Sequence, residues 1–546
     1  MKKFKISLLI ILIMTISIAA VSAADNSSEL EIAQFEDSML DVSSDVENNV
    51  VQSTNDFEIL SDEENGNNFT SLQSTIDNGG LVSLSSDYVR VDGEYDVLIS
   101  KNVTLFGNNH KIDADNKGGI FKVQSGCTLT LIGVTLINGN AEYGGAIYNN
   151  GNLAISHSYL INNTATKSGG AIYDEGGNVN VFGSTFDNNI VRDLTKNDDT
   201  GGAAIHAINS NITITDSRIT NNGNKSMSRT NNDLTNGAIN LLSSEAHITN
   251  TLFENNTGIY GSAITALPVS GSTSKNIKID ACNFTNNVAY AGTVHIEKSS
   301  YTILNSIFTK NMATGVGSNG YTAAGGAISI LYNADECLID NCTFIKNSVT
   351  NTSNAQGGAI SIEFNEVTII NSRFEENSAE IVGGAIDAYE TTIIIKNCDF
   401  TGNSANTGGA ISASGNTSIS NSAFVDNEAA NYTNAMYIWK TGSSLNLSNN
   451  TITAGEYAQI RVQNGVNVVS PLKVVILENS TKNITMAGCN ITAVVTDDMD
   501  NLIIDLSFRF VVGDNEVSGI IINSTTGVYA TTFIPNDDGT FVVSTN

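Results

Sequence analysis

Residues 383–403 read GGAIDAYETTIIIKNCDFTGN, and residues 408–427 again open with Gly-Gly-Ala-Ile and close with Phe-Val-Asp-Asn. This motif, a Gly-Gly-Ala-Ile head and a Phe-x-x-Asn tail, recurs with variations, and its tails are Leu160/Asn163, Phe186/Asn189, Ile219/Asn222, Phe253/Asn256, Phe284/Asn287, Phe308/Asn311, Phe344/Asn347, Phe374/Asn377, Phe400/Asn403 and Phe424/Asn427. The shortest copies are 24 to 26 residues long, and the longer ones contain insertions. A repeat of this length is typical of a solenoid.

The residues between head and tail predict strands. Apolar and polar residues alternate, as in Val367-Thr368-Ile369, and β-branched residues are frequent. Period-two alternation of this kind indicates half-buried β-strands. A unit of about 25 residues with short strands and Gly or Asn corners predicts one coil of a right-handed parallel β-helix.

Each repeated position has a physical reason in such a coil. We expect the tail Phe or Leu to point inward and to stack on its equivalent one coil away. The tail Asn tolerates a left-handed corner, and its amide can form a hydrogen-bonded ladder with the same amide above and below. The paired Gly residues of the head allow positive φ or close backbone approach where the coil bends.

The heads and tails resemble the repeats of polymorphic outer-membrane proteins. More closely, residues 67–546 resemble the large adhesin-like surface proteins of methanogenic archaea, and the resemblance includes the entry segment Phe69-Thr70-Ser71-Leu72 and the stretch 103–112. It implies a right-handed parallel β-helix followed by immunoglobulin-like modules. It also implies an adhesive or cell-envelope protein exposed at the surface.

The N-terminal residues precede the repeats and have their own composition. Residues 1–23 combine early lysines, an apolar run from Ile6 to Ala20 and a small-residue cleavage site, which predicts a signal peptide. The alternative is an uncleaved membrane anchor. Residues 24–66 are rich in Ser, Asn, Asp and Glu and predict an acidic disordered spacer, or alternatively an acidic interaction tail.

The remaining chain divides into two predicted domains. Residues 67–469 are assigned to the β-helix, with a short amphipathic helix from Phe69 to Ile76 capping its open first coil. Residues 470–546 contain six short apolar segments separated by turn signals, including one from Leu502 to Val512, and these predict an immunoglobulin-like β-sandwich. No stretch after the signal peptide is apolar enough to span a bilayer, so we expect no membrane insertion of the mature chain.

The charge excludes one class of partner. The formal net charge is −30 and the pI is near 4.3, which opposes binding to nucleic acid or to anionic membranes.

The six cysteines do not form an obvious disulfide set. Cys282, Cys342 and Cys398 share one position of the repeat, but Ser306 and Ser372 occupy that position in the coils between them. Two coils span roughly 9.6 Å, beyond the roughly 7 Å limit for a disulfide. We expect buried thiols.

The sharpest alternative function is a polysaccharide lyase or glycoside hydrolase, since β-helices can carry such sites on one face. Hydrolysis requires two carboxylates roughly 5 to 9.5 Å apart. Asp174 and Asp387 fall in similar positions many coils apart, and Glu363 could approach Asp387 across adjacent coils, but no basic residue recurs beside them. The five histidines lack metal-ligand spacing, and we expect them on the surface or in turns. The sequence therefore predicts no catalytic residue, no cofactor and no metal site.

Four long insertions follow tails at Phe186, Ile219, Phe308 and Phe344, and all leave the same corner of the coil. Recognition tends to reside in loops held by a rigid scaffold. The insertions predict a binding edge that includes Arg192, Lys196, Arg229 and Tyr321. The alternative is that the insertions are tolerated and have no function.

From the resemblance we expect a secreted, cell-surface adhesin-like protein that attaches non-covalently to carbohydrate or protein on other cells or matrix. Its partners would be surface glycans or proteins of neighbouring cells, and the sequence predicts no particular oligomeric state. A structural cell-envelope protein is the first alternative, and the β-helical enzyme is the second. The fold alone does not assign the function.

Overall fold

The computed structural model describes residues 67–545 except 193–199, 224–235, 270–274, 315–324, 333–336, 351–354, 431–434, 454–458, 471, 477–480, 485–488, 507–508, 513–514, 524–526 and 534–538. The predicted signal peptide and spacer lie outside the described residues. Residues 63–546 form one compact unit. Within the described part of the chain, no helix has the length and apolar character needed to cross a bilayer.

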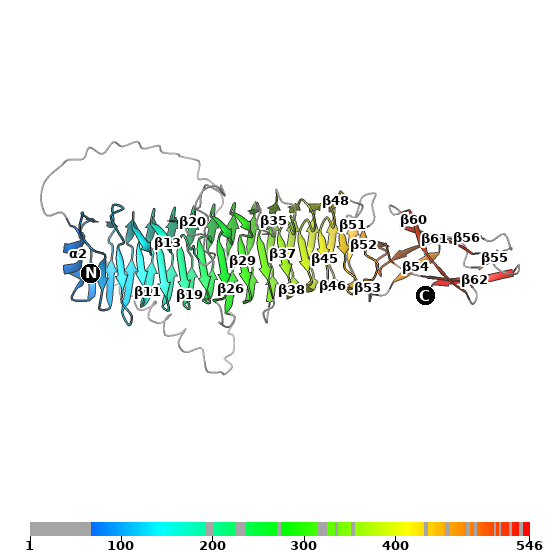
Figure 1. Cartoon of the computed structure of the whole chain (residues 1–546), viewed down its shortest axis with the longest axis horizontal. Coiled ribbons are helices and arrows are strands. Elements are labelled where there is room, and N and C mark those ends of the chain that lie inside the picture. The colour runs from blue at the N-terminus through cyan, green and yellow to red at the C-terminus, as the bar shows by residue number, and fades with distance from the viewer. Residues whose placement is uncertain are drawn as a thin grey trace, which may run out of the picture. The chain divides into compact units, whose positions relative to one another are not determined.

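The chain folds as the predicted right-handed parallel β-helix (Figure 1). One coil consists of β41 (Ile386–Tyr389), β42 (Thr392–Lys396), β43 (Asp399–Thr401) and β44 (Ser404–Ala405). Within the coils, each strand hydrogen-bonds in parallel to its equivalents one coil before and after. This builds sheets of 15, 14 and 7 strands and most of a 19-stranded sheet, whose remaining strands are C-terminal and pair antiparallel among themselves. Residues at equivalent positions therefore form columns that run along the coil axis.

The tail phenylalanines form one interior column, as predicted. Seven of them, from Phe253 to Phe424, are fully buried. Their rings stack with centroids 4.5 to 5.0 Å apart and planes within 9° of parallel. This column forms part of a continuous apolar core that runs through the coils.

The tail asparagines form the predicted amide ladder. Nδ2 of Asn377 donates to Oδ1 of Asn403 at 3.0 Å, and Nδ2 of Asn347 donates in the same way to Asn377. The predicted left-handed conformation was assigned to the wrong residue, because φ is positive one position earlier, as at Asn286 and Glu376. The turn at that preceding residue directs the ladder amide into the interior, where its bonds are shielded from water.

The head glycines meet the predicted requirement for close approach. Gly383 has a φ of 63°, and a Cβ on Gly384 would lie 2.0 Å from the carbonyl oxygen of Gly409 in the next coil. No larger residue fits there without moving the backbone.

The N-terminal helix α2 (Phe69–Ile76) begins at the cap residue Asn68 and buries Phe69, Leu72 and Ile76. The side chain of Gln73 accepts from the backbone N–H of Leu98 and donates to its carbonyl oxygen. Leu98 lies in β3 (Val97–Ile99), the first strand of the coil stack on this side, so α2 supplies hydrogen bonds to an otherwise open sheet edge.

The described cysteines Cys127, Cys282, Cys337, Cys342 and Cys398 are free thiols. Cys342 is buried, and its Sγ donates to the carbonyl oxygen of Asp340 at 3.3 Å. Its backbone N–H donates to the Ser372 hydroxyl of the next coil at 3.1 Å. Cysteine and serine therefore alternate in one column, with each coil between two cysteines occupied by a serine.

The C-terminal residues form antiparallel strands around a separate core. One group is β54 (Lys473–Ile476), β56 (Cys489–Thr496), β57 (Leu502–Ile504), β60 (Ile520–Asn523) and β61 (Val528–Phe533), and the other is β55 (Thr481–Ile484), β58 (Arg509–Val512), β59 (Asn515–Ser518) and β62 (Gly539–Thr545). The segment predicted as one strand from Leu502 to Val512 is two strands, with Asp505 at a φ of 63° between them. The immunoglobulin-like assignment stays a prediction.

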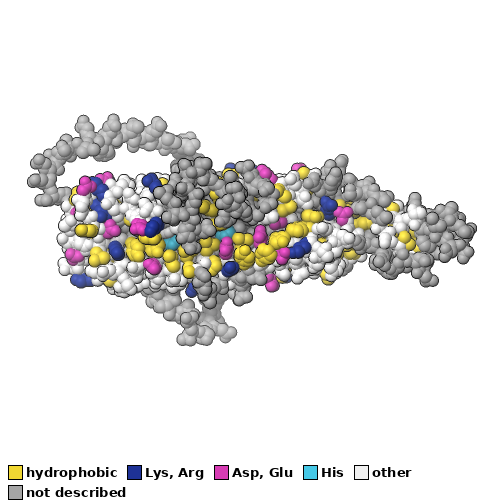
Figure 2. Space-filling view, in the orientation of Figure 1, with side chains coloured by type: hydrophobic (Ala, Val, Ile, Leu, Met, Phe, Trp, Pro, Cys, Tyr) yellow, Lys and Arg dark blue, Asp and Glu magenta, His cyan; other side chains and the backbone are white. Residues whose placement is uncertain are grey.

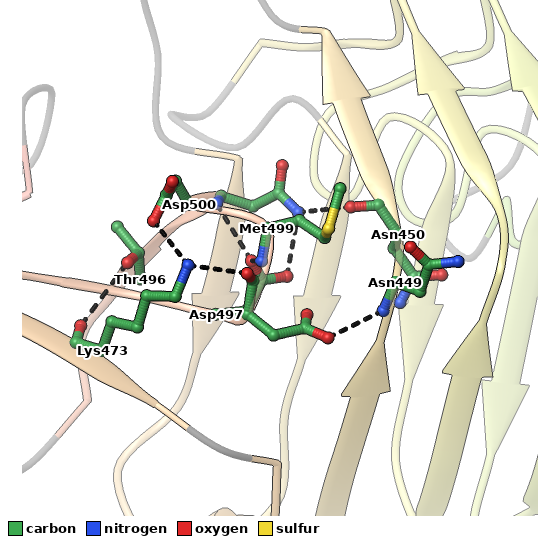
Figure 3. Close-up of polar contacts among 9 residues, drawn as sticks. Asn449, Asn450, Lys473, Thr496, Asp497, Met499 and Asp500 are labelled. Carbon is green, nitrogen blue, oxygen red and sulfur yellow. Dashed lines mark hydrogen bonds and ion pairs between the residues drawn. The ribbon is translucent and has the colours of Figure 1, made fainter.

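The C-terminal strands join the β-helix directly. β57 pairs in parallel with β52 (Ile460–Val462) of the last coil, and Ile503 enters the β-helix core. Asp497 accepts from the backbone N–H groups of Met499 and Asn501 (Figure 3). The turn held in this way lets Asn501 donate to the carbonyl oxygen of Asn450 at 2.7 Å.

Candidate binding surface

The four long insertions leave the β-helix at one corner. Each follows the tail of one coil and precedes the first strand of the next, namely β18 (Ile205–Ile208), β21 (Ile239–Leu242), β33 (Ile328–Leu331) or β37 (Ile360–Glu363). Arg192 is exposed at this corner, and its backbone N–H donates to the carbonyl oxygen of Ala165. Lys196, Arg229 and Tyr321 lie outside the described residues, so their grouping with Arg192 stays a prediction.

A polar row follows the outer face of the 19-stranded sheet. It consists of the second residue of each first strand, and its buried members in register are Tyr173, His206, Asn240, Thr265, His295, Ser329, Ser361, Asp387 and Ser412. Asp174, which the sequence placed in a position similar to that of Asp387, is one residue out of register and pairs with Ala207. A shift of one residue moves a side chain to the opposite face of a strand. The expected equivalence of the two aspartates is therefore wrong.

Two histidines of this row are buried, although surface or turn positions were expected. His206 stacks on Tyr173 with ring centroids 5.3 Å apart. Burial lowers the pKa of His206 to about 3, so the ring is neutral. His295 stacks on Tyr260 at 5.0 Å. The stacked column of coils covers these rings with neighbouring aromatic residues, which the spacing along the sequence does not reveal.

His295 joins Ser329 and Glu297 in a hydrogen-bonded chain. Its Nδ1 lies 3.2 Å from the Ser329 hydroxyl, and its Nε2 lies 3.3 Å from Oε1 of Glu297. The hydrogen bond with His295 lowers the pKa of Glu297. The connectivity is that of a nucleophilic triad. However, Ser329 and His295 are each 1% exposed, so the hydroxyl and the ring are buried.

Asp387 and Glu363 are the carboxyl groups for which the sequence predicted an approach across adjacent coils. Burial raises the pKa of Asp387 to about 7, and the charge of Glu363 adds to the shift. Burial also raises the pKa of Glu363. Asp387 is only 1% exposed, which separates it from any sugar on the surface.

A second group of side chains, less buried, lies where the first strands of the 19-stranded sheet end, and it occupies two adjacent columns, with Tyr332 and Phe364 in one and Tyr389 and Trp439 in the other. Tyr332 and Phe364 follow β33 and β37, Tyr389 ends β41, and Trp439 follows β49 (Met436–Ile438). Ring centroids are 5.9 Å apart for Tyr332 and Phe364, 5.3 Å for Phe364 and Tyr389, and 5.6 Å for Tyr389 and Trp439. We call these four residues the aromatic row.

Tyr389 and Trp439 meet although a coil lies between them. That coil carries Ser414 and Gly415 at the corner and no large side chain. The two rings therefore approach each other above it.

Two members of the aromatic row have an unfavourable backbone conformation. Tyr332 has a φ of 65° and Phe364 a φ of 55°. Other coils place Gly176, Asn209, Ser243, Lys298 and Glu390 at the same corner, also with positive φ, so the conformation belongs to the corner itself. A bulky side chain in this region costs about 1 to 2 kcal/mol. Residues held in such conformations are often functional.

Charged side chains flank the aromatic row. The Lys298 ammonium lies 5.1 Å from the centroid of Tyr332, and that of Lys440 lies 5.4 Å from Tyr389 and also pairs with Glu390. Figure 2 shows hydrophobic side chains gathered in a band along the coil axis over the 19-stranded sheet, with charged side chains beside it. Tyr332 is 45% exposed, whereas the interior phenylalanines are fully covered. The face thus offers aromatic surface to a partner.

One repeat matches a known family model. Residues 157–175 match the Chlamydia polymorphic membrane protein repeat. This chain carries a polymorphic membrane protein repeat. The expected repeat type is thereby confirmed, while the methanogen origin and the adhesin role stay predictions.

Solved structures resemble this chain only at low identity and low TM-score. A tailspike protein of E. coli bacteriophage HK620 in complex with a pentasaccharide is 13% identical, with a TM-score of 0.37, over 87% of this chain and 88% of that chain. A variant with a hexasaccharide is 12% identical, with a TM-score of 0.41 and the same coverage. An alginate lyase in complex with a trisaccharide is 12% identical, with a TM-score of 0.35, over 74% of this chain and 81% of that chain. No curated protein sequence matches this chain. These likenesses carry no ligand over to it.

The aromatic row was missed in the sequence, although a signal was present. Tyr332 and Phe364 each follow the first Gly of their polymorphic membrane protein-type head by seven residues, at Gly325 and Gly357. The recurring Gly, Phe and Asn positions mark the interior and the corners of the coil. An outward position varies from coil to coil, so its aromatic members stand out only once the columns are known.

Proposed function

We propose that this protein is displayed at the cell surface and attaches non-covalently to carbohydrate on neighbouring cells or matrix, with the aromatic row as its main contact. The observation that carries the proposal is the presence of partly exposed aromatic rings on an outer corner, two of them in an unfavourable left-handed conformation. Aromatic side chains supply large contact area with little loss of conformational freedom.

The coil stack supports this role because it holds the rings at nearly fixed spacing. Tyr332, Phe364 and Tyr389 come from consecutive coils whose first strands β33, β37 and β41 pair in parallel. A rigid arrangement loses little entropy on binding. The net charge of −30 favours uncharged partners over nucleic acid.

Secretion and surface display are part of the proposal. They rest on the signal-peptide pattern in residues 1–23 and on the polymorphic membrane protein-type repeat at residues 157–175. The insertion edge with Arg192, Lys196, Arg229 and Tyr321 is proposed as a second contact surface, since its loops leave one corner. We propose no catalytic role, because Asp387 and Ser329 are buried.

The test compares binding of the full chain and its variants to intact cells and matrix. Tyr332→Ala together with Tyr389→Ala should abolish most binding, and Tyr159→Ala is the control. Tyr159 is 50% exposed in β12 (Tyr159–Ile161), which belongs to the 14-stranded sheet. Equal binding by all three proteins would reject the aromatic row as the contact. Absence of binding by the unaltered protein to every cell and matrix tested would favour a structural envelope role.

A further inference from the structure

The aromatic row has the geometry and charge of a site for one class of carbohydrate. We infer that it binds a neutral linear polysaccharide that lies along the coil axis, one sugar unit over each ring. This inference rests on the proposed attachment function and specifies its ligand. It commits to sugar as the occupant, rather than a protein or a second copy of the chain.

The first argument is that the ring faces remain partly uncovered. Tyr332 and Phe364 are within 8° of parallel, yet their centroids are 5.9 Å apart. The interior phenylalanines, with the same coil spacing, approach to 4.5 to 5.0 Å. Tyr332 and Phe364 are therefore slipped sideways, which leaves part of a ring face uncovered beside the Lys298 ammonium, and Tyr332 is 45% exposed. The C–H groups on one side of a pyranose ring pack on such a face.

The second argument concerns periodicity. Parallel strands of successive coils are roughly 4.8 Å apart. The centroid separations between successive coils are 5.9 Å for Tyr332 and Phe364 and 5.3 Å for Phe364 and Tyr389, whereas the 5.6 Å between Tyr389 and Trp439 spans two coils. Sugar units of an extended chain repeat on the same scale. A polymer parallel to the axis therefore meets several rings in succession, whereas a single sugar meets only one.

The third argument comes from the backbone. At the corner position of Tyr332 and Phe364, other coils carry Gly176, Asn209 and Ser243, and also Lys298 and Glu390, all with positive φ. Aromatic side chains at this position make the corner less favourable than it would be with Asn. Lys298 and Glu390 adopt the same conformation in the flanking coils, so the backbone cost belongs to the corner and supports a ligand contact only together with the 45% exposure of Tyr332.

The fourth argument concerns charge. The carboxylates of Glu297, Glu363 and Glu390 lie on the same two columns as the aromatic row, with Lys298 and Lys440 as the cations there. Lys440 is already paired with Glu390. Carboxylates accept hydrogen bonds from sugar hydroxyls, and they repel a polyanionic chain. The site therefore suits uncharged sugars and disfavours polyuronates.

The decisive variant replaces Tyr332 and Phe364 together by Asn, which other coils accept at this corner. Binding of the full chain to neutral β-linked hexose oligomers, from disaccharide to hexasaccharide, is measured by calorimetry, with a polyuronate as the acidic control. We expect affinity to rise with oligomer length and the polyuronate to bind weakly. The double variant should lose about ten-fold or more in affinity for the longer oligomers while its melting temperature stays the same or rises. Tyr159→Asn should change neither binding nor melting.

Three results would overturn the inference. One is that no neutral oligomer or polymer binds the unaltered protein, and another is that the double variant binds as well. The third is a lower melting temperature of the double variant, which would assign the rings to packing. If cells still bind through the aromatic row after enzymatic removal of their glycans, the occupant is a protein. The proposed attachment function would then stand, and the assignment of a sugar as the ligand would be wrong. Concentration-dependent dimerisation lost in the double variant would identify a second copy as the occupant.

Discussion

Phe374 and Phe400 stack face to face inside the β-helix, with ring centroids 4.7 Å apart and planes 3° from parallel. They come from adjacent coils and belong to a column that continues in both directions. Each ring fills the space that its neighbour would otherwise leave empty, so neither contact is independent of the rest of the column.

Removing one ring should weaken the column locally. Phe374→Ala leaves a cavity between Phe344 and Phe400 and should lower the free energy of unfolding by about 3 to 5 kcal/mol. Urea unfolding followed by circular dichroism measures the change. Phe182→Ala, at a position that is 40% exposed, is the matched control and should lower the free energy of unfolding much less. Equal losses would mean that the interior column does not carry the stability we assign to it.

A substitution in the amide ladder should lower the stability of the protein when it removes a hydrogen-bond donor, even if the side chain keeps its size. Asn377 accepts from the N–H and Nδ2 of Asn347 and donates to Phe344 and Asn403. Asn377→Asp removes the Nδ2 donor and places acceptor oxygens next to one another. At a pH above the pKa of the new carboxyl, this should lower the free energy of unfolding by about 1 to 3 kcal/mol for each unmatched group.

The control for the ladder is the exposed Asn371. It donates to Asp340 and accepts from Asn397 outside the β-helix. Because water replaces lost partners there, Asn371→Asp should change stability by about 0.5 kcal/mol or less. Thermal melts over a pH series test both variants, and a similar loss in both would argue against burial as the cause.

Asp387 should make stability depend on pH. Its pKa is about 7 in the folded protein against an ordinary value of 3.8, because it is buried beside Ser412 and near Glu363. Below pH 3.8 the Asp387 carboxyl is neutral in both the folded and the unfolded protein. Between pH 3.8 and about 7 the folded state holds a proton that the unfolded state has released, so the unfolding free energy falls as pH rises.

The slope should be about 1.4 kcal/mol for each pH unit in that window. Asp387→Asn is neutral at every pH and should remove this contribution, so the stability difference between variant and unaltered protein should grow from pH 4 to 7 and then level off. Urea unfolding at closely spaced pH values measures it. A constant difference would mean that Asp387 titrates normally.

Cys342 should tolerate serine. Serine occupies the same column in neighbouring coils, where Ser372 donates to the carbonyl oxygen of Ile370 as Cys342 does to that of Asp340. Cys342→Ser should change stability by about 1 kcal/mol or less, whereas Cys342→Leu should overpack the site and cost about 1 to 3 kcal/mol.

The same thiol should be unreactive in the folded protein. Burial raises the pKa of Cys342 to about 12, so little thiolate exists at neutral pH. Alkylation followed by peptide mass spectrometry should label the less buried Cys127 first and Cys342 only after unfolding. A disulfide at Cys342 under non-reducing conditions would contradict this.

The coil that contains β51 (Thr451–Thr453) should depend on Asn501. Its amide donates to Asn450, and its Oδ1 accepts from the N–H of Ile452 at 3.2 Å. Asn501→Ala removes both contacts and should speed amide exchange at Ile452 while lowering stability by roughly 1 to 3 kcal/mol. Lys473→Ala removes an exposed ion pair with Asp500 and should have little effect. If exchange at Ile452 is unchanged, the C-terminal strands do not stabilise this coil.

The sequence alone determined the coil and its interior. The recurring Phe, Asn and paired Gly are each required by contact with an identical residue one coil away, so repetition along the chain reports packing directly. The helix from Phe69 to Ile76 could be predicted for a similar reason, since its apolar spacing matches one buried face.

Only the tertiary structure decided what lies outside the coil. Whether Asp174 shares a face with Asp387 depends on a register difference of one residue, which insertions of variable length hide in the sequence. Burial of His206 and His295 depends on neighbours from other coils. The aromatic row is likewise assembled from Tyr332, Phe364, Tyr389 and Trp439, which are far apart in sequence and contact one another because stacking of the coils brings their corners together.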